Sequence, residues 1–210
     1  MPQLQIRLLG QFQVRLDKGV VTSFVSDKAR ALLAYLAVEG RTAQRRETLA
    51  NLLWPENNET RARGNLRCAL ANVRKVIGDT QAQTPFLSVT RHDIKIFPES
   101  NAWVDVDILS RVHSIATPTI ENIPQFDAVL KLYTGEFLMG FNLPDSLAFD
   151  EWALLKREGY SRMMDAILQR ATDFYEEQGE YAAALPFAWR HVSLEPWQER
   201  ARRQLMLLLV

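Results

Sequence analysis

The stretch ETRARGNLRCALANVRKVIG, residues 59–78, decides the fold, because it combines an apolar stripe with strong positive charge. Stepping 100° per residue places its apolar side chains within one arc of a helix. These are Ala62, Leu66, Ala69, Leu70, Val73, Val76 and Ile77. The stretch holds five Arg or Lys residues and a single carboxylate, that of Glu59. The sequence therefore predicts an amphipathic helix with a basic outer face.

The ends and the outer face of this helix can also be predicted. Asn57 or Asn58 can cap its start, and Gly78 favours a left-handed stop after the last apolar residue. The outer face carries small residues, Gly64 and Cys68 among them, between basic and amide side chains. Such a face has two interpretations, a solvated charged surface or a contact with a polyanion. The neighbouring segments decide between them.

Composition limits the class of protein. The chain has 210 residues, of which 47% are hydrophobic and 24% charged, enough for one or two ordinary cores. No apolar run approaches the ~20 residues that a membrane span needs, and the N-terminus lacks a signal-peptide pattern. The single cysteine, Cys68, excludes an internal disulfide and fits a reducing compartment. We expect a soluble cytoplasmic protein with no membrane partner.

Charge is divided unequally along the chain. Residues 1–97 contain 15 Lys and Arg against 8 Asp and Glu, whereas residues 98–210 contain 10 against 17. The formal net charge of zero therefore hides a basic first half and an acidic second half. This indicates two domains with different partners, the first partner being a polyanion.

The order of elements in the basic half is that of a winged helix-turn-helix. Residues 4–10 and 12–16 alternate as two short strands, and Ser26 can cap a helix that ends at Gly40. A second helix stops before Pro55. At its start, Gln44 and Arg45 stand where a Ser or Thr cap is expected. After the basic helix, FLSVT and IKIF flank the turn RHD, residues 91–93. Three helices and a hairpin predict a DNA-binding module whose third helix reads the duplex.

Two groups of side chains are the candidates for DNA contact. The small residues of the third helix allow close approach to a groove, while Arg and Asn can reach phosphates and base edges. The predicted contact residues are Arg61, Arg63, Asn65, Arg67, Asn72 and Lys75 on that helix and Arg91 in the hairpin turn. The sequence leaves open which of them touch bases and which touch phosphates.

The acidic half predicts helices packed on one another. The relative spacing of Tyr175, Gly179, Tyr181, Ala184 and Pro196 matches a tetratricopeptide hairpin. The tryptophans and the tyrosines at helical spacing are expected in the core, with Tyr181, Leu185, Ala188 and Val192 facing inward. The apolar run LMLLLV at the end indicates that this domain continues in a longer protein. The expected fold is mainly α with small β-sheets.

Several segments resemble one bacterial regulator family. LQIRLLGQFQV, KARALLAYLAVEGR, RETLANLLWP and RARGNLRCALANVRKVIG resemble the OmpR-like winged helix of the Streptomyces antibiotic regulatory protein family. VDVDIL, LKLYTGEFLMGF, DEWALLKREGYSRMMDAIL and VSLEPWQERARRQLM resemble the bacterial transcriptional activator domain that follows it there. The domains expected from this resemblance are residues 1–98 and 99–210, winged helix first and tetratricopeptide-like helices second.

The resemblance implies a function. It implies a transcriptional activator that binds double-stranded DNA at promoter repeats, as two copies side by side, and engages RNA polymerase. Asn58 to Ile77 then form the recognition helix, and Arg91 lies in the wing. Larger relatives append ATPase, cyclase or repeat domains after this pair.

Other function classes fit less well. His92, His113 and His191 lie in unrelated segments, and no phosphate-binding loop, nucleophile elbow or zinc motif is present, so no catalytic residue, metal or cofactor is expected. Asp105 and Asp107 alternate in a segment expected to be extended, where hydrogen bonding at a strand end is favoured over an acid pair. The alternative function is a protein-interaction module of a larger signalling protein, with a purely structural winged helix. Salt dependence of DNA binding separates the two.

Overall fold

The computed structural model describes residues 3–17, 19–97 and 100–209, and the chain gathers into two compact units. Unit 1 comprises Met1–Val106 and Phe137–Lys156, and unit 2 comprises Asp107–Glu136 and Arg157–Val210. Each unit is thus built from two separate stretches of sequence. The border expected between residues 98 and 99 stays a prediction, because both residues lie outside the described part.

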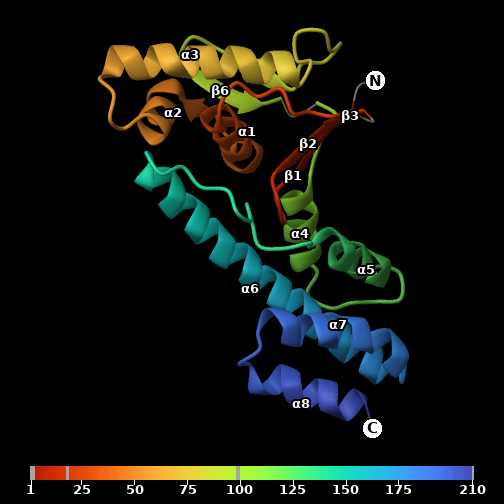
Figure 1. The fold of residues 1–210 in the computed structure, drawn as a ribbon. Helices are drawn as coiled ribbons and strands as arrows, with labels where there is room; N and C mark the ends of the chain where they lie inside the picture. The colour runs from red at the N-terminus through yellow and green to blue at the C-terminus, as the bar shows by residue number, and fades with distance from the viewer. Residues whose placement is uncertain (1–2, 18, 98–99, 210) are drawn as a thin grey trace. The chain divides into compact units, whose positions relative to one another are not determined.

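In the described residues, unit 1 contains two small sheets, three complete helices and the first turns of α6 (Leu147–Glu177) (Figure 1). The first sheet has the order β3-β2-β1-β7, with β1 antiparallel to β2 and parallel to β7. The second is antiparallel, with the order β4-β6-β5. The strands are β1 (Leu4–Arg7), β2 (Gln13–Leu16), β3 (Gly19–Val20), β4 (Gln44–Arg45), β5 (Leu87–Val89), β6 (Asp93–Ile96) and β7 (Ala102–Val104). The two predicted strands and the hairpin are therefore confirmed. The strands β3, β4 and β7 were not predicted from the sequence.

The three predicted helices are present, as α1 (Asp27–Glu39), α2 (Arg46–Leu53) and α3 (Glu59–Val76). Two of them, α1 and α3, begin at their predicted capping residues. The Ser26 hydroxyl accepts a hydrogen bond from the Ala29 amide, and the Asn58 side chain accepts one from the Arg61 amide. Gly78 has φ 67°, a left-handed conformation that costs a residue with a Cβ more than glycine. The apolar stripe of α3 is buried against α1 and α2, as predicted.

The start of α2 is fixed by a strand rather than by a side-chain cap. No side chain caps this helix at Arg45. Instead, Gln44 pairs with Ile94 of β6. The backbone amide two residues later, that of Arg46, donates to the His92 carbonyl at 2.9 Å. The hairpin that follows α3 is thereby joined to the beginning of α2.

The second stretch of unit 1, residues 137–156, adds an aromatic cluster under α1. The Trp152 indole donates to the Glu39 carboxylate at 2.9 Å, and Lys156 pairs with the same carboxylate at 2.7 Å. The rings around Trp152, at centroid distances of 4.8–5.8 Å, are those of Tyr35, Phe149 and Phe137. A segment far from the basic helix in sequence thus stabilises the helix that α3 packs on.

The expectation of an extended segment at residues 105–107 is wrong, because α4 (Asp105–His113) begins there, directly after β7. The preferred role for the carboxylate of Asp105 is nevertheless confirmed. It accepts hydrogen bonds from the backbone amides of Leu8 at 2.8 Å, Leu9 at 2.9 Å and Val106 at 2.9 Å. Asp105 therefore satisfies the end of the β1 segment and the first turn of α4 at once.

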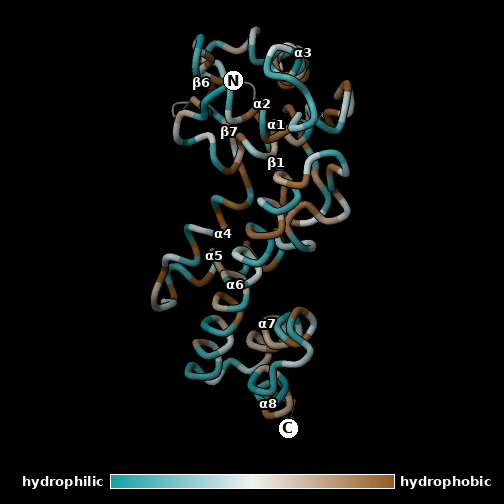
Figure 2. The backbone as a smooth tube through the Cα atoms, turned by 90° about the vertical axis from the view of Figure 1, so that its left-hand side faces the viewer, coloured by the Kyte–Doolittle hydropathy of each residue, from teal (hydrophilic) through white to brown (hydrophobic). Residues whose placement is uncertain are grey.

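Unit 2 is helical throughout its described part. Besides α4 it contains α5 (Ile123–Leu132), most of α6 (Leu147–Glu177), α7 (Tyr181–Leu194) and α8 (Glu199–Leu208). The tube in Figure 2 carries both apolar and polar residues along α6, as an amphipathic helix should. Gly179, with φ 73°, separates α6 from α7, which packs against α8. No helix in the described residues is both long and apolar enough to span a membrane.

One predicted core face in unit 2 is confirmed only in part, since Ala188 is buried but Tyr181 is not. Tyr181 is 57% exposed, Trp189 55% and Trp197 88%, although all three were expected in the core. The residues that α7 buries are Ala184, Phe187, Ala188 and His191. These stand at i, i+3, i+4 and i+7, so the buried arc is rotated from the arc expected to start at Tyr181.

Candidate nucleic-acid interface

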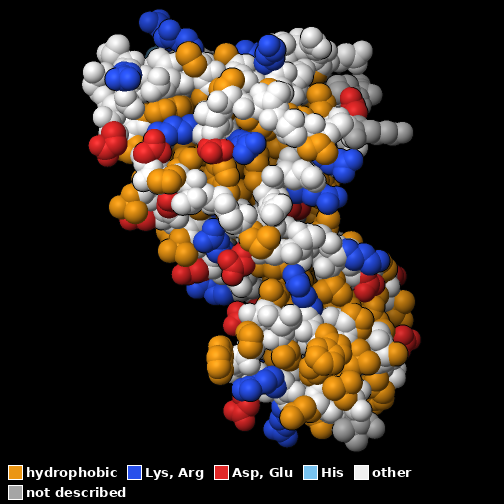
Figure 3. All heavy atoms as spheres, viewed as in Figure 1, with side chains coloured by type: hydrophobic (Ala, Val, Ile, Leu, Met, Phe, Trp, Pro, Cys, Tyr) orange, Lys and Arg blue, Asp and Glu red, His pale blue; other side chains and the backbone are white. Residues whose placement is uncertain are grey.

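The outer face of α3 is open and basic. Arg61, Arg67 and Lys75 are exposed, and none of them has an ion pair within the described part of the chain. Cys68 is exposed between them, and a Cβ added at Gly64 would meet no atom within 4 Å. Figure 3 shows Lys and Arg side chains at the top of the view, where Figure 1 places α3. Small residues among unpaired cations leave room for a close approach to this face.

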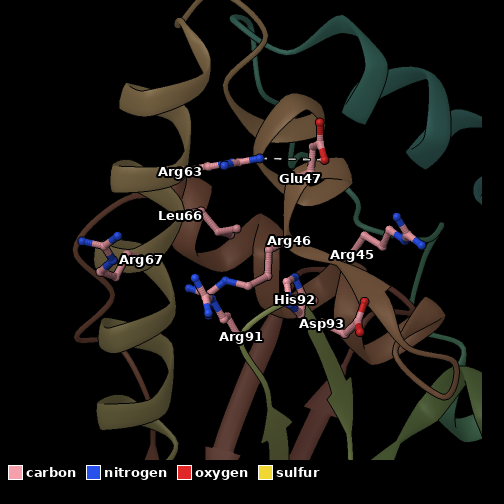
Figure 4. Close-up of a pocket in the computed structure, with 9 residues that line it drawn as sticks. All are labelled: Arg45, Arg46, Glu47, Arg63, Leu66, Arg67, Arg91, His92 and Asp93. Carbon is pink, nitrogen blue, oxygen red and sulfur yellow. Dashed lines mark ion pairs between the residues drawn. The ribbon is translucent and has the colours of Figure 1, made fainter.

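A basic hollow of about 820 Å³ lies beside this face, where α3, the start of α2 and the hairpin turn meet (Figure 4). Its lining residues are Arg45, Arg46, Glu47, Arg63, Leu66, Arg67, Arg91, His92 and Asp93. Five guanidinium groups therefore surround the hollow with only two carboxylates. Three elements that are separate in sequence supply the arginines, so the fold concentrates positive charge here.

The hairpin turn that carries Arg91 is held in one conformation. The Thr90 hydroxyl accepts hydrogen bonds from the amide of Asp93 at 2.9 Å and from that of His92 at 3.2 Å. The Arg46 guanidinium donates to the Thr90 carbonyl at 3.2 Å, so α2 also contacts the turn. Figure 4 shows the Arg46 side chain extending from α2 toward this turn. Arg91 itself is exposed.

The end of α3 is tied to the same hairpin by a buried ion pair. The Asp79 side chain is fully buried and accepts from the Arg74 Nε at 2.7 Å and from the Leu87 amide at 2.8 Å. Leu87 is the first residue of β5. A buried carboxylate with both partners in place fixes α3 relative to the wing.

Among the predicted contact residues, Arg63 and Asn72 are the two whose side chains have partners in the described part of the protein. Arg63 pairs with Glu59 at 2.5 Å and with Glu47 at 3.9 Å. The Asn72 side chain accepts from the Val25 amide at 3.2 Å and donates to the Ser23 carbonyl at 3.4 Å. Asn72 thus holds the segment before α1 against α3, whereas Asn65 is half-buried on the same flank. The DNA contacts of all seven residues stay predictions.

Arg45 and Arg46 are the residues of the hollow that sequence reasoning missed. A signal for them is present, because cations at a helix N-terminus are unfavourable with the helix dipole. Two adjacent arginines at the start of α2 therefore do not serve the stability of that helix. Their position next to the hairpin could not be foreseen, since it depends on pairing between β4 and β6.

Comparisons with known proteins identify the second half of the chain and the fold of the whole. Residues 113–210 match the family described as Bacterial transcriptional activator domain. The structure of Mycobacterium tuberculosis EmbR in complex with a low affinity phosphopeptide has a similar fold, with a TM-score of 0.72 at 22% sequence identity. The likeness covers 99% of this chain and 55% of the EmbR chain, so this chain spans about half of that protein's length. None of the curated proteins matches this chain.

The match and the fold agree with the sequence-based resemblance. The residues that match the activator domain lie in the helical second half, and the element order of unit 1 is that of a winged helix-turn-helix. The described residues contain no cluster of three or more metal-ligating side chains. The chain therefore has the fold of a winged-helix domain followed by a helical domain, and residues 113–210 of the helical part match the bacterial transcriptional activator domain.

Proposed function

We propose that this chain binds double-stranded DNA through unit 1 and activates transcription from the bound promoter. The observation that carries the proposal is the basic hollow beside the open face of α3. Arginines from α2, α3 and the wing converge there, beside a helix whose outer face is unpaired and rich in small residues. Phosphate contacts supply much of the affinity of a DNA-binding protein, and such a cluster provides them.

The arrangement suggests a division of labour among the basic residues. Lys75 lies opposite the buried stripe of α3 and Arg61 lies on the flank away from the hollow, so a helix placed in the major groove would direct them at base edges. Arg67 lies on the flank that lines the hollow, with Arg46 and Arg91 across from it. A phosphate strand borders the major groove, and this flank would face it. We therefore assign base contacts to the outer face and phosphate contacts to the hollow.

The remaining functional expectations rest on the family resemblance. A regulator of this type would act in the cytoplasm, bind promoter repeats as two copies side by side, and engage RNA polymerase. No catalytic role is proposed. This chain spans about half of the EmbR chain, so the proposal does not include activities of the remainder of EmbR.

The test is selection of fragments of the source genome by the complete chain, followed by binding assays on the enriched duplex. The double variant Arg46→Ala and Arg67→Ala should bind both the enriched and a scrambled duplex more weakly. Arg202→Ala with Arg203→Ala is the matched control, because both arginines are exposed on α8 and lie outside the hollow. The proposal fails if wild-type protein enriches no sequence and binds no duplex even at low salt.

A protein-interaction module is the second candidate function. The exposed Trp189 and Trp197 of unit 2 favour it, since large aromatic residues are enriched at protein interfaces. The two functions predict different salt responses. Duplex binding through several phosphates must weaken steeply with salt, whereas burial of tryptophan in a partner is much less sensitive.

A further inference from the structure

Arg63 differs from the other arginines of the basic hollow. Of the five, it is the one with carboxylate partners among the residues that the structure describes. Both partners contact the same nitrogen, Nη2, with Glu59 at 2.5 Å on α3 and Glu47 at 3.9 Å on α2. Figure 4 shows Arg63 pointing from α3 toward Glu47 at one edge of the hollow.

The pairing weakens the attraction of this edge for a polyanion. Two carboxylates beside one guanidinium leave a local charge of −1, while Arg46, Arg67 and Arg91 on the other sides of the hollow keep theirs. A phosphate that approached Arg63 would find its guanidinium charge already compensated by Glu47 and Glu59. It would also have to displace the closer carboxylate, at the cost of an exposed ion pair.

The geometry points to a role for Glu47 and Glu59 as residues that limit DNA affinity. We propose that they do so by holding Arg63, so that Arg63 meets a phosphate only by exchanging these partners. This inference rests on the proposed DNA-binding function and adds to it a restraint on binding that does not depend on the base sequence of the DNA. A restrained phosphate contact lowers affinity for every duplex alike. Base contacts then supply a larger share of the binding free energy.

The carboxylate variants test this directly. Glu47→Gln, Glu59→Gln and the double variant keep side-chain size and remove charge. Glu56→Gln is the matched control, because Glu56 is exposed, lies between α2 and α3, and has no ion pair in the described residues. Affinities are measured by fluorescence anisotropy at several salt concentrations on the enriched duplex and a scrambled one. Thermal unfolding of each variant checks that loss of Glu59 from the first turn leaves α3 intact.

The expected result is tighter binding that depends on Arg63. The double variant should bind both duplexes about two- to fivefold more tightly, which is the strength of an exposed ion pair. The plot of log affinity against log salt should steepen by up to about one unit. Neither change should occur with Glu56→Gln, nor when the double variant also carries Arg63→Ala.

Three results would overturn the inference while leaving the DNA-binding function in place. They are unchanged affinity of the double variant, an equal gain from Glu56→Gln, and a gain that persists without Arg63. The last would mean that the carboxylates act by direct repulsion of phosphates. Absence of duplex binding by wild-type protein would instead remove the proposed function, and this inference with it.

Discussion

Substitution of Arg67 tests a phosphate contact without disturbing the fold. The Arg67 side chain is exposed on the hollow flank of α3, next to the buried Leu66. We expect Arg67→Ala to weaken binding to the enriched and scrambled duplexes by the same factor and to lower the salt slope by about one unit. Gel shifts on both duplexes, with circular dichroism alongside, measure this. A selective loss on the enriched duplex would instead make Arg67 a base contact.

Asp105 predicts a pH dependence of stability. Burial raises its pKa to about 6, although the hydrogen bonds from Leu9, Leu8 and Val106 act in the opposite direction. The folded state thus holds the proton more tightly than the unfolded state, in which the carboxyl has its ordinary pKa of 3.8. The contribution of Asp105 to stability is therefore largest below about pH 4, and it falls by about 3 kcal/mol as pH rises from there through 6.

Comparison with Asp105→Asn isolates this contribution from those of the other acids. The free energy of unfolding by urea is measured for both proteins between pH 4 and pH 7. The wild-type value should fall relative to the variant across this range. A relative rise would mean that the backbone hydrogen bonds outweigh burial and that the folded carboxylate stays ionised.

Residues whose role is local were the ones that could be predicted. Ser26, Asn58 and Gly78 act within a few positions of a helix end, so their chemistry is visible in the sequence. Arg46 and Asp79 act on the hairpin that follows α3, and each depends on a contact that only the fold creates. The predicted contact residues therefore contained Arg61, Arg63 and Arg67 of α3 and the arginine of the turn, but not the pair at the start of α2.

The wing is an element whose function can be measured through one side chain. Thr90, His92 and Asp93 hold the turn, and Arg91 projects from it into solvent. We expect Arg91→Ala to lower duplex affinity and flatten the salt slope by up to about one unit, with little change in preference among major-groove sequences. Identical slopes and affinities for variant and wild type would leave the wing as scaffold.

Element periodicity predicted helices better than short strands. The stripes of α1 and α3 extend over several turns, so their periods are unambiguous. Strands β3 and β4 have two residues each and β7 has three, too few for alternation to be recognised. In α7, apolar residues occur on most of the circumference, and the buried arc is rotated from the predicted one, with which it shares Ala188.

At the scale of the whole molecule, Trp152 tests whether residues 137–156 are an integral part of unit 1. It is half-buried and donates to Glu39, 113 positions away in the chain. Trp152→Ala should cost about 3 kcal/mol, toward the lower end of the range for large aromatic residues because the ring is partly exposed. Hydrogen exchange should show faster exchange of the amides in α1.

The control for this experiment is Trp197→Ala, which removes an 88% exposed tryptophan from unit 2. It should leave both the urea midpoint and the exchange of α1 unchanged. Unaltered protection of α1 in Trp152→Ala would show that residues 1–106 hold their structure without the aromatic cluster.

Because unit 1 is built from two separate stretches of sequence, the ribosome completes it in two steps. Residues 1–106, which carry both sheets and helices α1 to α3, are translated before residues 137–156, which pack against α1. At ribosomal rates this interval lasts roughly 3–10 s, far longer than helix or hairpin formation takes. Throughout it the nascent chain exposes the aromatic surface of α1 without its ring partners. The helix on which α3 packs therefore gains its aromatic partners only after the first turns of α6 have been made, when part of the segment 113–210 has already been translated.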